Sequence, residues 1–204
     1  MKQDTLIAET MEEKAKRLET YETPEWVVRA ILEREILTRH VVDPCAGRGV
    51  MGRVAGEYGY ILEQYDFADW GNGGVIAGRD FLGADWPPQD FLQGASVIMN
   101  PPFSRACDFV RRSFDLGARK IVCFQRFAWW ESAERRDFWC AFPPNRVYIC
   151  GERATCWRFD LADAGRGGNT PTAHAWYVWE AGHPGGTQLG HIYKNDATNG
   201  VGLL

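Results

Sequence analysis

Residues 41–52, VVDPCAGRGVMG, place an apolar run before an acidic residue, a glycine-rich turn and a helix-forming segment. Asp43 ends the run, and its carboxylate suits a ligand that carries an ammonium group. In a doubly wound sheet a ligand binds at the carboxyl ends of the strands, and glycines such as Gly47 and Gly49 let the backbone approach it. The G-x-G spacing matches neither a P-loop nor the G-x-G-x-x-G dinucleotide fingerprint. The segment therefore predicts a strand, a turn and a helix around a ligand, although such a turn is often only structural.

Short apolar runs alternate with segments of helical periodicity along the 204 residues. This alternation predicts an α/β fold, with a mostly parallel, seven-stranded sheet and helices on both faces. The last two strands follow each other without a clear helix, so we expect an antiparallel strand at one edge. Expected strands cover residues 40–44, 60–66, 73–82, 95–100, 120–125, 146–151 and 173–180, and expected helices cover 3–20, 25–37, 50–58, 105–117 and 131–142.

The length predicts a single domain spanning 1–204. Within it we expect residues 1–20 to be an N-terminal helix and residues 181–204 to be a C-terminal tail. The charges are uneven: residues 1–99 contain 10 Lys and Arg against 17 Asp and Glu, whereas residues 100–170 contain 12 against 8. A local basic face can attract a polyanion although the net charge is −4. A solvated surface is the simpler alternative.

Metal and membrane sites are not expected. The six cysteines form no C-x-x-C pair, and the four histidines show no ligand spacing. No apolar run approaches the about 20 residues of a membrane span, and the charged N-terminus lacks the apolar core of a signal peptide. These features predict a cytoplasmic protein with reduced cysteines, no metal and no membrane partner.

A second unusual segment, SVIMNPPF at residues 96–103, ends an apolar run in an amide, two prolines and an aromatic ring. Proline cannot donate to a sheet, so the strand must stop there. A strand end with a turn is the simpler interpretation. A stiff binding edge that presents polar atoms and a ring is the alternative.

Two further acidic residues follow expected strands. Asp66 is placed to accept hydrogen bonds from a ribose, with Glu63 as a second choice. Asp80 and Phe81 supply a carboxylate for an adenine amino group and a ring for stacking. Acids at the surface, without a ligand, are the alternative.

Three motifs in order give the chain a family resemblance: residues 21–26 (YETPEW), 43–49 (DPCAGRG) and 100–103 (NPPF). They resemble the T-P element, the D/E-P-x-x-G-x-G motif and the [DNS]-P-P-[YFW] motif of class I S-adenosylmethionine-dependent methyltransferases, specifically those that methylate amino groups of DNA. The motif order is similar to the gamma arrangement, and the N-P-P-F form goes mostly with N6-adenine. The chain looks most like small phage and prophage adenine-methyltransferase-like proteins. The resemblance implies a Rossmann-like fold and a phage-encoded protein in a bacterial cytoplasm.

The resemblance implies S-adenosyl-L-methionine as the cofactor and duplex DNA as the partner, with the target base flipped out. It implies that the Asn100 and Pro101 carbonyls accept the amino hydrogens, that Phe103 stacks on the base, and that Pro101 and Pro102 keep the segment stiff. Thr23 before Pro24 also predicts a helix N-cap. The residues expected to bind the cofactor are Tyr21, Thr23, Pro24, Asp43, Pro44, Cys45, Ala46, Gly47, Gly49, Asp66, Asp80, Phe81 and Asn100.

One departure from the family concerns target recognition. Gamma enzymes usually have a sizeable recognition domain, but only 24 residues follow Glu180, so no separate one is expected here. An RNA adenine, a glutamine amide or a non-catalytic binding role therefore remain alternatives, as do a monomer and a homodimer. Trp129 and Trp130 could border the flipped base, although core packing is the simpler interpretation. Candidate phosphate contacts are Arg105, Arg111, Arg112, Arg126, Arg135, Arg136, Arg153 and Arg158.

Overall fold

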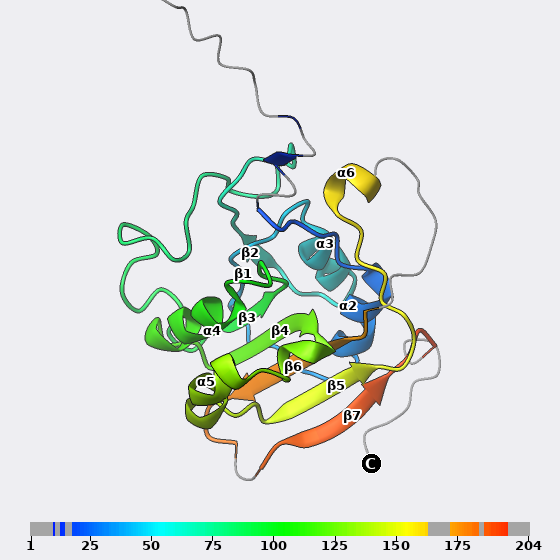
Figure 1. Cartoon of the computed structure of the whole chain (residues 1–204). Helices are drawn as coiled ribbons and strands as arrows, with labels where there is room; N and C mark the ends of the chain where they lie inside the picture. The colour runs from blue at the N-terminus through cyan, green and yellow to red at the C-terminus, as the bar shows by residue number, and fades with distance from the viewer. Residues whose placement is uncertain (1–9, 11–12, 15–17, 163–171, 184–185, 196–204) are drawn as a thin grey trace, which may run out of the picture.

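The computed structural model describes residues 10, 13–14, 18–162, 172–183 and 186–195. Its strands form one seven-stranded sheet in the order β2-β1-β3-β4-β6-β5-β7 (Figure 1). The strands are β1 (Val41–Asp43), β2 (Leu62–Gln64), β3 (Ser96–Met99), β4 (Lys120–Arg126), β5 (Arg146–Cys150), β6 (His174–Glu180) and β7 (Gln188–Ile192). The helices are α2 (Glu25–Leu32), α3 (Val50–Glu57), α4 (Ala106–Asp115), α5 (Arg136–Ala141) and α6 (Phe159–Ala162), with 3-10 turns η1 (Phe127–Trp129) and η2 (Ala133–Arg135).

The sheet confirms the predicted fold class, but its reversed strand lies inside it. β6 is antiparallel to both β4 and β5, and every other neighbouring pair is parallel. The two strands expected at 146–151 and 173–180 do pair antiparallel, as β5 and β6, but the reversed strand is not the edge strand that the sequence predicted. Residues 174–179 of β6 are all buried, which suits a strand covered on both faces. The more exposed β7 forms the edge instead.

The seven strands are not the seven that the sequence predicts. Residues 73–82 form no strand and contribute only the isolated bridge between Tyr65 and Ile76. Glycines surround the two apolar residues there, so the run is too short and too flexible to extend a ladder. β7 takes the seventh place and lies within the expected tail, 181–204. Its sequence, QLGHI, lacks an apolar alternation that would have predicted it.

Helix ends also differ from the prediction. α2 ends at Leu32, well before residue 37, and the helix expected over 131–142 divides into η2 and α5. Most of the helix expected over residues 3–20 lies outside the described residues.

Two helical layers cover the sheet, because alternate strand residues face opposite sides. Ile98 and Val122 pack with α2 and α3, whereas Val97 and Ile121 pack with α4 and α5. Figure 1 shows these two pairs of helices on opposite sides of the sheet. The buried indole of Trp176 donates to the Val27 carbonyl at 3.0 Å and fixes α2 against the sheet.

A buried charge network holds the end of the sheet where β4 and β5 begin. Glu35 pairs with Lys120 at 2.9 Å and with Arg146 at 2.5 Å. Glu180, at the end of β6, pairs with the same two cations at 3.2 and 2.6 Å. The network thus lies at the opposite end of the sheet from the ends of β1 and β3.

Candidate active site

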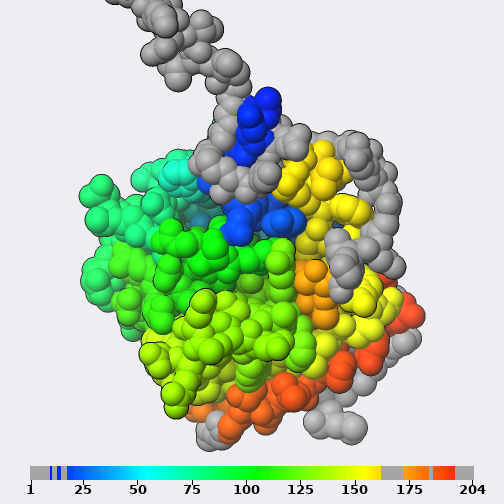
Figure 2. All heavy atoms as spheres, in the orientation of Figure 1, coloured from blue at the N-terminus to red at the C-terminus, as the bar shows by residue number. Residues whose placement is uncertain are grey.

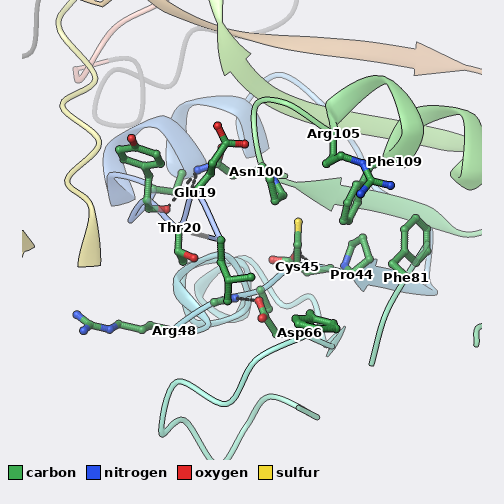
Figure 3. A pocket seen from close by; sticks show the side chains of 18 of the residues that line it. Glu19, Thr20, Pro44, Cys45, Arg48, Asp66, Phe81, Asn100, Arg105 and Phe109 are labelled. Atoms are coloured by element: carbon green, nitrogen blue, oxygen red, sulfur yellow. Dashed lines mark hydrogen bonds between the residues drawn. The ribbon is translucent and has the colours of Figure 1, made fainter. Parts of the chain in front are cut away.

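A cavity of about 400 Å³ opens where β1 and β3 end. Figure 3 shows Phe81 and Phe109 at one end of it, Glu19 and Thr20 at the other, and Cys45 between them. Most of the residues expected in the cofactor site and the N-P-P-F motif line it. They are Tyr21, Thr23, Asp43, Pro44, Cys45, Ala46, Gly47, Asp66, Asp80, Phe81, Asn100 and Pro102. Pro24, Gly49, Pro101 and Phe103 do not line it.

The turn after β1 requires its two glycines. Gly47 and Gly49 adopt φ of 56° and 76°, in the left-handed region that side chains disfavour. A Cβ on Gly47 would lie 2.8 Å from the ring of Phe159, and one on Gly49 would lie 2.5 Å from the Asn72 amide nitrogen. Gly49 is also the N-cap of α3, so its part is to start that helix. The glycines thus shape the cavity wall, and Gly47 alone of the two faces the cavity.

Asp43 is a buried acid beside the cavity, with 1% of its surface exposed. Its Oδ1 accepts the Cys45 N–H at 3.1 Å. Burial, assisted by the nearby Asp66 carboxylate, raises the pKa of Asp43 to about 8. A cationic group entering the cavity would oppose this shift and favour the ionised form.

Asp66 is tied to the glycine turn. Its Oδ2 accepts the Gly47 N–H at 2.8 Å, and its Oδ1 accepts from the Ala68 N–H at 2.8 Å and the Trp70 indole at 3.2 Å. Burial raises the pKa of Asp66, and these three donors act against that rise. The carboxylate is therefore held rigidly at the cavity wall. Glu63, the second choice, is outside the cavity lining.

Phe81 provides an apolar surface for the cavity. It is 1% exposed overall, and its ring packs on Phe109 with centroids 5.3 Å apart. The neighbouring Asp80 lines the cavity too, and its Oδ1 accepts the Leu82 N–H at 3.0 Å. A carboxylate and a ring thus lie side by side at this end of the site.

The T-P element contacts the N-P-P-F motif directly. Asn100 Nδ2 donates to Thr23 Oγ1 at 3.0 Å and to the Tyr21 carbonyl at 3.5 Å. The expected N-cap was wrong, because Pro24 occupies that position and the Thr23 hydroxyl turns to Asn100 instead. With both amide hydrogens engaged, the carbonyl oxygen is the part of the Asn100 side chain able to accept from a substrate.

Pro101 and Phe103, the other two motif residues with an assigned role, do not line the cavity. The Pro101 carbonyl accepts the buried Gln125 Nε2–H at 3.0 Å. The Phe103 ring stacks on Tyr21, with centroids 5.1 Å apart, and lies 4.2 Å from the Arg126 guanidinium carbon. The motif therefore borders the cavity through Asn100 and Pro102 and an adjacent surface through Phe103, which contacts Arg126.

Three segments far apart in sequence meet beside the cavity. Glu19 accepts from Ser104 N at 3.0 Å and from Ser104 Oγ at 2.5 Å. The Glu22 N–H donates to the Trp157 carbonyl at 2.8 Å. In Figure 2 the blue N-terminal residues lie between the green residues after β3 and the yellow residues of α6. These contacts join the N-terminal segment to both sides of the opening.

The sequence analysis did not predict several lining residues, because long-range contacts place them at the cavity. Phe159 is the clearest: its ring meets Gly47 and lies 4.5 Å from the Arg48 guanidinium. A local signal existed for Glu22 and Arg48, which lie inside the quoted motifs, and for Ser104, which directly follows one. The lining residues that were assigned neither to the cofactor nor to the N-P-P-F motif are Leu18, Glu19, Thr20, Glu22, Arg48, Val50, Met51, Phe67, Arg79, Leu82, Ser104, Arg105, Phe109 and Phe159.

Neither tryptophan after β4 lines the cavity. Trp129 is 5% exposed and packs edge-on against Trp139 and Tyr177, as the simpler interpretation predicted. Trp130 stacks on Trp139 with centroids 5.3 Å apart. These rings form part of the apolar layer under α5.

The part of the chain that the structure describes contains no cluster of three metal-ligating side chains. All six cysteines are free. Within the same residues, no helix combines the length and apolar character that a bilayer crossing requires.

Comparisons with known proteins rest on structure. Neither a scan of protein-family models nor a search of curated proteins gave a match. A candidate class I S-adenosylmethionine-dependent methyltransferase from Listeria monocytogenes superposes with a TM-score of 0.58 at 10% identity, over 98% of this chain and 77% of that one. A candidate RNA methyltransferase from Pyrococcus horikoshii gives 0.54 at 16% identity, over 80% and 88%.

A type I restriction-modification methyltransferase subunit from Streptococcus thermophilus gives a TM-score of 0.56 at 13% identity. The match covers 79% of this chain but only 44% of that subunit. At these identities the likeness concerns the fold. The chain has the Rossmann-like fold of class I S-adenosylmethionine-dependent methyltransferases.

Proposed function

We propose that this protein transfers a methyl group from S-adenosylmethionine to the exocyclic N6 amino group of adenine in DNA. The observation that supports this most is the orientation of Asn100. Thr23 and Tyr21 hold its amide nitrogen, which leaves the carbonyl oxygen to accept from a substrate beside the cavity. An exocyclic amino group is a planar donor that such an acceptor can orient.

The cavity residues fit the cofactor. A volume of about 400 Å³ is in the usual range for small-molecule sites. Asp43 would face the ammonium group, Asp66 the ribose hydroxyls, and Asp80 with Phe81 the adenine. When bound, S-adenosylmethionine supplies an electrophilic methyl group on a sulfonium. The turn at Gly47, which has no room for a Cβ, would bring the backbone close to it.

The motif residues would prepare the acceptor amine. The Asn100 carbonyl accepts one amino hydrogen, which draws electron density onto the nitrogen and directs it toward the cavity. The Pro101 carbonyl has one lone pair engaged by Gln125 and a second able to accept the other hydrogen. Because Pro101 and Pro102 restrict the backbone, the two acceptors keep their spacing. Holding the reacting groups in line is the main contribution such a site can make.

In duplex DNA the amine is paired and stacked, so the base must leave the helix to reach Asn100. Adenine in RNA is the second candidate. The chain spans 88% of the candidate RNA methyltransferase but less than half of the restriction subunit. The same four motif residues would serve adenine in either polymer.

Labelled methyl transfer to unmethylated duplex DNA, RNA and a protein lysate, run in parallel, tests the proposal. We expect label on DNA, recovered as N6-methyladenine. Label on RNA alone supports the second candidate, label on protein alone points to a glutamine amide, and cofactor binding without transfer points to a non-catalytic protein. Asn100→Ala should abolish transfer and largely retain cofactor binding. Near-normal transfer by this variant would contradict the role of Asn100.

A further inference from the structure

Tyr21, Phe103 and Arg126 present three planar groups in a row beside the motif, and of these only Tyr21 lines the cavity. Phe103 stacks on Tyr21 at an interplanar angle of 25°, and the Arg126 guanidinium carbon lies 4.2 Å from the Phe103 centroid. The row thus contains the one motif ring on which an extruded base could stack. The guanidinium, which is flat and delocalised, already contacts that ring.

Arg126 differs from three of the other candidate phosphate contacts of the basic half. Arg105 and Arg111 pair with Asp108, and Arg135 donates to the Trp129 carbonyl. Arg126 is exposed, and no carboxylate among the described residues lies within ion-pair distance of it. Its charge is therefore available to an anionic partner.

Arg126 lies next in sequence to the residue that holds one of the two proposed acceptor carbonyls. It is the last residue of β4 and directly follows Gln125, which holds the Pro101 carbonyl. The next residue, Phe127, is 39% exposed, although apolar rings are usually covered. The end of β4 therefore presents a cation and a partly exposed ring beside the motif.

Of the two groups that contact Phe103, Arg126 is the one that can leave. Tyr21 is held by its bridge to Arg158 and by the hydrogen bond from Asn100 to its carbonyl. Arg126 contacts Phe103 through a long, exposed side chain that changes rotamer without disturbing the backbone. A base that stacks on Phe103 would thus displace the guanidinium and keep it nearby.

We propose that Arg126 is a substrate-binding residue that covers Phe103 in the free protein and binds a phosphate of the nucleic acid when the target base takes its place. This inference rests on the proposed function, and it names the anionic backbone next to the flipped base as what Arg126 recognises. Charged hydrogen bonds to phosphate position a nucleic acid without reading its sequence.

The test compares Arg126→Gln, Arg126→Lys and the control Arg39→Gln, which alters an exposed arginine before β1, at the opposite end of the sheet. A fluorescein-labelled duplex of mixed sequence is titrated by anisotropy between about 50 and about 200 mM salt. For Arg126→Gln we expect about tenfold weaker binding and a salt slope smaller by about one unit. Arg126→Lys should keep the salt slope, and Arg39→Gln should match the wild type. Cofactor affinity should be unchanged in all three.

Unchanged or tighter binding by Arg126→Gln overturns the inference, because the guanidinium would then only pack on or block Phe103. A wild-type protein that binds no duplex overturns it too. Methyl transfer is measured on the same samples, so the two proposals can fail separately. If the wild type methylates DNA and Arg126→Gln has the same KM for DNA, the inference is contradicted and the proposed function is not. Weaker binding by Arg126→Gln, with no transfer to DNA by the wild type, supports the inference and contradicts the proposed function.

Discussion

Gln125 donates from its Nε2 to the carbonyl of Pro101 at 3.0 Å, and both residues are buried. This bond joins the end of β4 to the N-P-P-F motif after β3. Since prolines restrict the motif internally, Gln125 fixes its position relative to the sheet. Gln125 is accordingly a positioning residue for the acceptor carbonyls.

Gln125→Leu should lower kcat by about tenfold or more with little change in KM for the cofactor, because a small misplacement of the acceptors is costly. It should also destabilise the protein by about 1–3 kcal/mol, since a buried carbonyl loses its donor. Ser113→Ala is the matched control: it removes a buried hydrogen bond to the Phe109 carbonyl within α4. Equal kcat values for the two variants would show that Gln125 is only structural.

Thr23→Val tests how Asn100 is oriented. The substitution keeps the shape of the side chain and removes the hydroxyl that accepts from Asn100 Nδ2. We expect methyl transfer to fall by about tenfold, the equivalent of about 1.4 kcal/mol. Thr38→Val removes a comparable hydroxyl, bonded to Ser96 at the other end of the sheet, and should leave kinetics unchanged.

Gly47→Ala separates backbone strain from steric conflict at the cavity. Both Gly47 and Gly59 have positive φ, so the left-handed backbone makes alanine at either position cost about 1–2 kcal/mol. Only at Gly47 does the new Cβ meet Phe159, at 2.8 Å, whereas nothing lies within 4 Å at Gly59. We expect weaker cofactor binding for Gly47→Ala by calorimetry and normal binding for Gly59→Ala. Similar affinities would show that the turn does not contact the ligand.

The buried Asp43 predicts a pH dependence of binding and stability. Its pKa is raised from 3.8 to about 8, so between these values the folded protein holds a proton that the unfolded chain has released. The free energy of unfolding should therefore fall as the pH rises from about 4 to about 8. A ligand with an ammonium group needs the ionised form, so its affinity should rise over the upper part of that range. Titration with S-adenosylhomocysteine checks this. Asp43→Asn should remove the pH dependence of binding and reduce that of stability, to which the raised pKa of Asp66 also contributes.

The sequence predicted the parts of the site that depend on local backbone chemistry. The glycine turn and the two prolines restrict conformation wherever they occur, so 43–49 and 100–103 could be placed at strand ends in advance. β7 could not, because QLGHI has no apolar alternation and pairs with β5 only after β5 exists. Glu19 and Phe159 reach the cavity through contacts with Ser104 and Gly47, which no spacing encodes. The turn of Thr23 toward Asn100 likewise depends on the assembled sheet.

The place of β6 between β4 and β5 affects how the chain can be made. β4 ends at Arg126, but its partner on that side is residues 174–180. During synthesis this edge of β4 therefore remains unpaired until about fifty further residues have left the ribosome. Unpaired strand edges of this kind promote aggregation. A truncation before His174 would keep every motif residue and still leave β4 open. The last sheet residues are thus as necessary to a soluble product as the motifs are to its chemistry.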